Sequence, residues 1–181
     1  MTKRNALVAL TAAAAVAALG GCGSEPEKKA KAPPAAQAFE AGQWQSSLEV
    51  FNFRRADEGR PRLNMPNGTR VEGAACIGPG DTTRPPPELF VGDDFTNCRW
   101  IDNFSMRNGR LVSGMTCRRA GVGEVEISVE LDMTATSYQG TVQMLTRLVS
   151  DGDVTLSARA QGRRTGQCTA EEGAGNSQKA R

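Results

Sequence analysis

The side chains that could do chemistry in this sequence are cysteines and carboxylates, because the chain contains no histidine. Without an imidazole base, the Ser-His and Cys-His arrangements of nucleophilic enzymes are excluded. Two-carboxylate hydrolysis stays open, and the loop residues Asp81, Asp93 and Asp94 are the candidates for it. Acidic residues beside glycine are more often turn formers. We therefore expect no catalytic residues and a protein that is not an enzyme.

The first of the five cysteines, Cys22, stands apart from the others. It follows Leu19, Gly20 and Gly21, and this order of one aliphatic residue, two small residues and a cysteine resembles the lipobox of bacterial lipoproteins. The resemblance implies that the chain is cut before Cys22 and that its thiol carries a diacyl lipid. Two or more acyl chains anchor a protein stably, whereas one chain binds only marginally. The expected first partner is therefore a membrane, reached through the lipid at Cys22.

The residues before Cys22 have the layout of an export signal. Lys3 and Arg4 precede an apolar, alanine-rich run over residues 6–19, which is shorter than the roughly 20 residues that a bilayer-spanning helix needs. The residues after Cys22 are rich in Ala, Lys, Glu and Pro, a composition that cannot bury enough apolar surface to become ordered. The expected organisation has four parts: a signal peptide over 1–21, a lipidated cysteine and flexible tether over 22–41, a disulfide-stapled β domain over 42–168, and a disordered tail over 169–181.

These features predict a place in the cell envelope, with the lipid-anchored protein on the periplasmic face. The residue after the lipobox cysteine is Gly23. In enterobacterial lipoproteins an aspartate at this position favours the inner membrane, so the resemblance implies the outer membrane.

The charge of the mature chain excludes a nucleic-acid binder. Removing residues 1–21 removes Lys3 and Arg4 and no acidic residue, which leaves 20 basic and 20 acidic residues. Nucleic-acid binders usually carry a basic excess or stripe. Here the arginines form scattered doublets at 54–55, 118–119 and 163–164, which are typical of solvated strand ends. The alternative is a site for anionic phosphate or lipid head groups, which would need these doublets to converge in space.

The other four cysteines, an even number in an exported chain, predict two disulfides. Their spacings of 22, 19 and 51 positions do not resemble a zinc module, and no CxxC pair exists, so we expect no metal and no cofactor. In a meander the second strand ends where the third begins, which favours the pairs Cys76–Cys98 and Cys117–Cys168. The alternative, Cys98–Cys117 with Cys76–Cys168, ranks second because the expected register places Cys98 and Cys117 diagonally.

Residues 123–133, "GEVEISVELDM", alternate strictly between apolar and polar side chains, which predicts a strand with one buried and one wet face. The same alternation recurs over 98–106, 110–117, 137–145 and 154–162. Asn108-Gly109 is a strong hairpin signal, and pairing Arg107 with Arg110 across it would place Trp100 opposite Cys117.

Two earlier strands are expected over 42–53 and 69–77, with Phe51 and Phe53 breaking the alternation through a bulge. The predicted fold is therefore all-β, an antiparallel meander of about seven strands that curls toward a barrel or a sandwich, with disordered ends.

The order of these features resembles the family known as Domain of Unknown Function 3617, which consists of small exported proteins of Gram-negative bacteria. The resemblance runs through Gly42 and Trp44, a cysteine before a variable loop, a Gly-containing turn, Ser137-Tyr138, and Gly166 with Cys168. It implies an envelope location and a disulfide-stapled β domain, and it implies no activity, catalytic residue or ligand.

Two functions follow as hypotheses. The first is a non-enzymatic, lipid-anchored envelope protein that binds an unknown envelope protein or a small apolar ligand. The alternative is a structural or stress-related envelope protein without a ligand, and a carboxylate-based hydrolase ranks below both. Closed barrels of about eight strands can hold one small ligand, so the space inside the curled sheet distinguishes the first two hypotheses.

Overall fold

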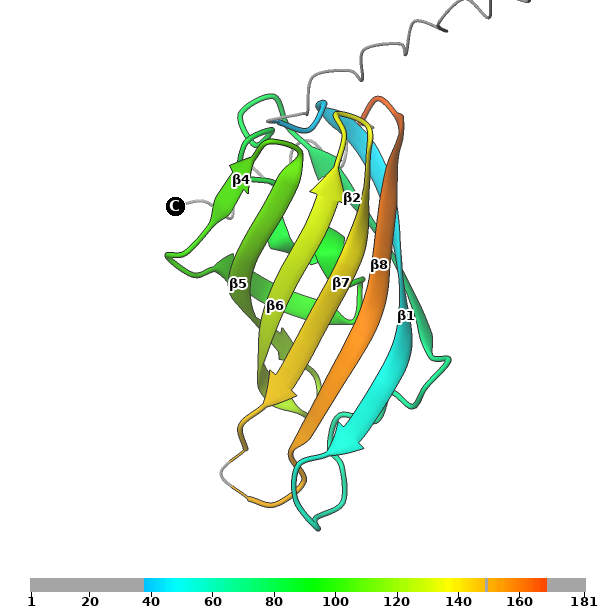
Figure 1. Cartoon of the computed structure of the whole chain (residues 1–181), viewed down its shortest axis with the longest axis vertical. Helices are drawn as coiled ribbons and strands as arrows, with labels where there is room; N and C mark the ends of the chain where they lie inside the picture. Colours follow the sequence, from blue (N-terminus) through cyan, green and yellow to red (C-terminus); the bar gives the residue numbers. More distant parts are fainter. Residues whose placement is uncertain (1–37, 149, 169–181) are drawn as a thin grey trace, which may run out of the picture. The chain divides into compact units, whose positions relative to one another are not determined.

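Eight antiparallel strands form one sheet in the computed structural model, which describes residues 38–148 and 150–168 (Figure 1). The all-β antiparallel prediction is confirmed. No helix within those ranges is long and apolar enough to cross a membrane. The elements are β1 (Gly42–Arg55), β2 (Arg70–Ile77), the 3-10 turn η1 (Pro87–Phe90), β3 (Phe95–Trp100), β4 (Ser105–Arg107), β5 (Arg110–Arg119), β6 (Gly123–Met133), β7 (Ser137–Thr146) and β8 (Val154–Gly166).

The strands are ordered β2-β1-β8-β7-β6-β5-β3 across the sheet, and β4 also pairs with β5. Strands β5 to β8 follow one another as the predicted meander. Strand β1 pairs with β8, so β2 and β3 lie at opposite edges of the sheet. The strand expected over 98–106 is divided into β3 and β4, which accounts for the additional strand.

One face of the sheet supplies the hydrophobic core. On β6 the five apolar side chains predicted to face inward are each at most 5% exposed, and the intervening residues are exposed. The expected bulge in β1 is also present, because the pairing with β8 shifts between Val50 and Asn52. The shift leaves Phe53 packed against the core and Phe51 exposed.

A segment that we call the strap, residues 78–94, covers the inner face of the sheet and contains η1. In Figure 1 η1 lies behind the sheet. Leu89, Phe90 and Val91 of the strap are fully buried. The hydroxyl of Tyr138, near the start of the central strand β7, donates a hydrogen bond to the carbonyl oxygen of Leu89 (2.9 Å).

The strap also reaches both edge strands. At the β2 edge, Asp93 Oδ1 accepts from the amide of Ala74 (3.3 Å), and the Asp93 amide donates to the carbonyl of Glu72 (3.4 Å). At the β3 edge, Glu88 Oε1 accepts from the amide of Cys98 (3.3 Å). The sheet is therefore a curled half-barrel, and a loop instead of further strands bridges its two edges.

The predicted pair Cys76–Cys98 is wrong, because Cys98 is bonded to Cys117. The hairpin register at Arg107–Arg110 is as expected. However, the strand expected over 98–106 is interrupted after Trp100, where β3 ends, and resumes only at β4. As a result, Trp100 pairs with Met115 instead of Cys117. This slip of two residues keeps every side chain on its face and brings Cys98, beside a bulge, opposite Cys117.

The predicted pair Cys117–Cys168 is wrong as well, because Cys168 is bonded to Cys76 with a Cα–Cα distance of 5.5 Å. Strand β1 lies between β2 and β8, so the residues after β8 cross the start of β1 to reach the end of β2. Gly42 permits this close crossing, because an added β-carbon there would collide with the Gly166 carbonyl and the Arg164 side chain. The pairing that ranked second in the sequence is the observed one.

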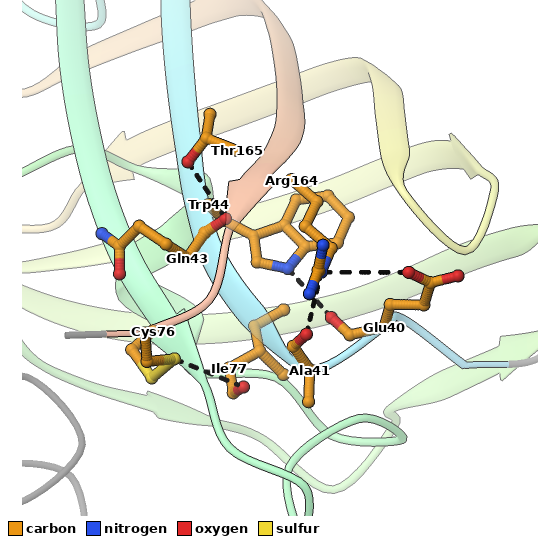
Figure 2. The surroundings of a disulfide bond; sticks show 9 residues. Glu40, Ala41, Gln43, Trp44, Cys76, Ile77, Arg164 and Thr165 are labelled. Atoms are coloured by element: carbon orange, nitrogen blue, oxygen red, sulfur yellow. Dashed lines mark hydrogen bonds and ion pairs between the residues drawn. A yellow bond between two sulfur atoms is a disulfide. The ribbon is translucent and has the colours of Figure 1, made fainter. Parts of the chain in front are cut away.

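The packed part of the chain begins before residue 42, the predicted domain boundary. Phe39 is only 2% exposed, and its ring meets that of Trp44 edge-on at 5.0 Å. Figure 2 shows the neighbouring contacts: Trp44 Nε1 donates to the Glu40 carbonyl (3.1 Å), and Arg164 Nε donates to the Ala41 carbonyl (2.8 Å). The residues 38–41 therefore belong to the folded domain and not to the tether.

Candidate functional site

The outer face of the sheet, turned away from the strap, carries a continuous row of polar side chains that lie opposite one another on neighbouring strands. Gln139 of β7 lies opposite Gln161 of β8, and Gln161 lies opposite Ser47 of β1. Asp132 of β6 continues the row beyond Gln139, and Glu72 of β2 continues it beyond Ser47. We call these five residues the amide row. The row crosses five strands and spans roughly 19 Å, since neighbouring strands lie about 4.8 Å apart.

Two of the hollows in the outer face, of about 640 and 500 Å³, meet along the amide row. All five residues of the row line both hollows. The other polar side chains of the larger hollow include Gln45, Thr134, Ser137 and Arg163, and those of the smaller one are Glu49, Arg70, Thr141 and Arg159.

The carboxylates of the amide row differ from the other strand carboxylates on the same face. Away from the row, glutamates are matched with arginines as Arg70–Glu49 (2.9 Å), Arg147–Glu126 (2.9 Å), Arg99–Glu124 (3.3 Å) and Arg110–Glu130. Among the residues that the structure describes, the side chains of Asp132, Gln139 and Glu72 make no hydrogen bond or ion pair. Within the row, Gln161 Nε2 donates to Ser47 Oγ (3.2 Å). The row therefore presents polar groups that the sheet itself leaves available.

The inner face, by contrast, is occupied by the protein's own side chains. The rings of Phe39, Phe90 and Trp44 surround Tyr138 with centroid distances of 5.0–6.3 Å. Burial raises the pKa of Tyr138 well above its ordinary value of 10.0, because the tyrosinate anion would lose its hydration there.

The three carboxylates considered for hydrolysis are each placed by local structure. Asp93 caps the edge of β2, as described above. Asp94 Oδ2 accepts from Arg119 Nη2 (3.1 Å), and the backbone amide of Asp81 closes a turn onto the Gly78 carbonyl (3.0 Å). None of the three lines either hollow of the amide row. No group of three His, Cys, Asp or Glu residues that could hold a metal ion occurs in residues 38–148 and 150–168.

The arginine doublets divide between different tasks. Arg119 pairs with Asp94 and lies 5.3 Å from the centre of the Phe95 ring. Arg164 holds the start of β1, whereas its neighbour Arg163 lines the larger hollow. One member of the three doublets thus contributes to the candidate site.

The predicted lipidation site, Cys22, and its lipobox residues Leu19, Gly20 and Gly21 lie outside the described residues. The same is true of the predicted signal peptide, of most of the tether and of the tail. These assignments therefore stay predictions from the sequence.

The amide row was not found from the sequence. The alternation in β7 and β8 placed Gln139 and Gln161 on wet faces, where polar side chains usually serve solvation alone. Their alignment with Ser47 depends on the pairing of β1 with β8, which are more than 100 positions apart. The available signal was the choice of amides, instead of ions, at these exposed strand positions.

Comparison with known proteins identifies a family without a described activity. The model of the family described as "Protein of unknown function (DUF3617)" matches residues 39–168. No curated protein matches the chain, and no solved structure matches it.

Proposed function

The chain belongs to the DUF3617 family, a family of unknown function, and from that premise we propose that it is a lipid-anchored, non-enzymatic binding protein of the bacterial cell envelope. The lipid at Cys22 holds it at the membrane. The outer face of the half-barrel, at the amide row, is the surface that meets an envelope component.

The observation that carries this proposal is the contrast between the two faces of the sheet. The inner face is filled by aromatic and aliphatic side chains, with Leu63, Leu89 and Phe90 fully buried. The outer face holds two adjoining hollows whose shared lining is polar and, at Asp132, Gln139 and Glu72, without a partner in the described chain. A ligand can reach the outer face without displacing any part of the core.

A small apolar ligand inside the curled sheet is less well supported. Such a ligand would need the space that the strap residues Leu89, Phe90 and Val91 now occupy. The geometry therefore favours a polar ligand or partner on the outside.

The proposal is tested by photocrosslinking in living cells. A photoreactive amino acid replaces Gln139 of the amide row, and a matched protein carries it at Glu58, an exposed residue of the loop after β1. We expect crosslinked adducts with envelope material from position 139 and none, or different ones, from position 58.

Identical adducts from both positions, or adducts from neither, would contradict binding at the amide row. In the second case the structural envelope protein without a ligand becomes the better description. Either result leaves the lipid anchor to be judged on its own by membrane fractionation.

A further inference from the structure

We infer that the ligand of the amide row is a neutral, extended polysaccharide chain lying across the strands; this inference rests on the proposed function and names its ligand class. Three observations point to it: the balance of charge in the two hollows, the hydrogen-bonding character of their side chains, and the shape of the site. Each is independent of the family assignment.

The charges that line the two hollows cancel. The acidic residues are Glu49, Glu72 and Asp132, and the basic residues are Arg70, Arg159 and Arg163. Electrostatic complementarity, which governs the choice of charged partners, therefore favours neither a polyanion nor a polycation. An uncharged ligand fits this surface best.

The side chains of the row match a ligand that is rich in hydroxyl and amide groups. The side-chain amides of Gln139 and Gln161 each have two donor hydrogens and an acceptor oxygen, and the Ser47 hydroxyl can likewise donate and accept. Asp132 and Glu72 add acceptors at the two ends. A sugar hydroxyl must both donate and accept, so a mixed row of this kind can satisfy many hydroxyls at once.

The shape of the site suits a chain better than a single small molecule. The row crosses five strands from β6 to the edge strand β2 and is bordered along its length by the two hollows, so the site is elongated and a polymer that lies along it can continue past the edge at β2. Beside the smaller hollow, Phe51 is 41% exposed and lies 5.0 Å from the guanidinium of Arg159. This flat pair offers an apolar surface for the C–H face of a sugar ring.

A peptide that adds a strand to the sheet is a poorer candidate. Strand addition requires an exposed edge with unpaired backbone groups. The strap covers part of both edges, through Asp93 at β2 and Glu88 at β3. The available surface is a face of the sheet and not an edge.

The test is calorimetric titration of the full-length protein in detergent with two neutral β-1,4-linked probes, chitohexaose and cellohexaose. Binding of at least one probe is expected, and its affinity should change little between low and high salt because no net charge is involved. The double variant Gln139→Ala/Gln161→Ala should weaken binding about tenfold, the loss of roughly one to two net hydrogen bonds. The control Gln143→Ala removes an exposed glutamine of the same strand and face that lines neither hollow, and should leave the affinity unchanged.

Two results would overturn the inference: neither probe binds, or the double variant and Gln143→Ala have the same effect. Unfolding midpoints of both variants, expected to equal that of the parent protein, show that any loss is not caused by misfolding. If the probes fail while crosslinks at position 139 persist, the polysaccharide is excluded and binding at the amide row stands. If position 139 gives no crosslinked adducts either, both the polysaccharide inference and the proposed function are wrong.

Discussion

At the scale of single residues, Asp57 joins two loops that are far apart in the sequence. Its carboxylate accepts hydrogen bonds from the amides of Asp153 (2.9 Å) and Gly152 (2.9 Å) in the β7–β8 loop and of Gly59 (2.7 Å) in its own loop. The bonds from Asp153 and Gly152 hold the pKa of Asp57 below its ordinary value of 3.8. Because the folded state lowers this pKa, the stabilisation is complete above pH 3.8 and is lost as the pH falls through the lowered value.

Substitution of Asp57 by Asn should therefore destabilise the domain in a pH-dependent way. At neutral pH the variant should have a lower urea midpoint than the parent protein. The difference should shrink as the pH falls below 3.8 and should largely disappear below the lowered pKa, because there the parent carboxylate is protonated in the folded state too. Asp151→Asn, an exposed residue of the same β7–β8 loop, is the control and should change little. An effect of Asp57→Asn that is equal at all pH values would contradict a charge-dependent role.

Tyr138 gives a second prediction at this scale, because it is the only tyrosine in the chain. Burial raises its pKa above 10.0 in the folded state, so tyrosinate absorbance near 295 nm should not develop around pH 10 while the domain stays folded. Between pH 10 and the raised pKa the unfolded chain binds fewer protons, and stability should fall with rising pH. A reversible titration near pH 10 without unfolding, followed by circular dichroism, would show that the side chain is accessible to solvent.

At the scale of elements, the strap does two jobs: it fills the inner face and covers the edges of the sheet. Exposed edge strands invite pairing with other chains. Asp93→Ala removes the acceptor for the Ala74 amide and should lower the free energy of unfolding by about 1 kcal/mol. Hydrogen exchange should accelerate at Ala74 while the amides of β6 keep their protection. Unchanged exchange at Ala74 would indicate that the Asp93 carboxylate does not cap the edge.

The two disulfides give another prediction for the elements. Non-reducing peptide mapping should recover Cys76 with Cys168 and Cys98 with Cys117. The Cys76–Cys168 bridge closes a stretch of 92 residues and the Cys98–Cys117 bridge one of 19 residues. The entropy that each bridge removes from the unfolded chain should stabilise the domain by about 4.5 kcal/mol and about 3 kcal/mol, respectively. Replacing the pair Cys76 and Cys168 by serines should therefore destabilise the domain more than replacing the other pair. A peptide that joins Cys76 to Cys98 would refute this connectivity.

The sequence contained the elements but not their long-range pairing. Local signals such as the alternation over 123–133 and the Asn108-Gly109 turn predicted strands, faces and one hairpin register correctly. The pairing of β1 with β8, and the break after Trp100, depend on tertiary packing that no local pattern records. Both disulfides and the amide row follow from those two features. The preferred disulfide pairing was therefore wrong, and the candidate site was not recognised.

At the scale of the whole molecule, the residues that stabilise the fold are different from the polar residues that are exposed on the outer face. The inner face, the strap and both disulfides hold the domain together, while the outer face carries exposed polar side chains that the core does not need. Substitutions at Gln139 and Gln161 should therefore alter binding without altering folding, whereas changes at Trp44 or Leu89 should do the reverse. This separation is what makes the outer face a usable binding surface.

The anchor proposed at Cys22 gives the last prediction at this scale. The parent protein should sediment with membranes and enter the detergent phase in Triton X-114 partitioning, because two or more acyl chains bind a bilayer stably. Cys22→Ser removes the thiol that carries the lipid, so the variant, made with a general export signal in place of residues 1–21 so that cleavage does not depend on the cysteine, should stay in the aqueous phase. The matched variant Ser24→Ala keeps the cysteine and should partition as the parent does. Since Cys22 lies outside the two disulfides, both variants should retain the parent peptide map. Membrane association of Cys22→Ser equal to that of the parent protein would refute the lipid anchor and would require another explanation for any envelope location.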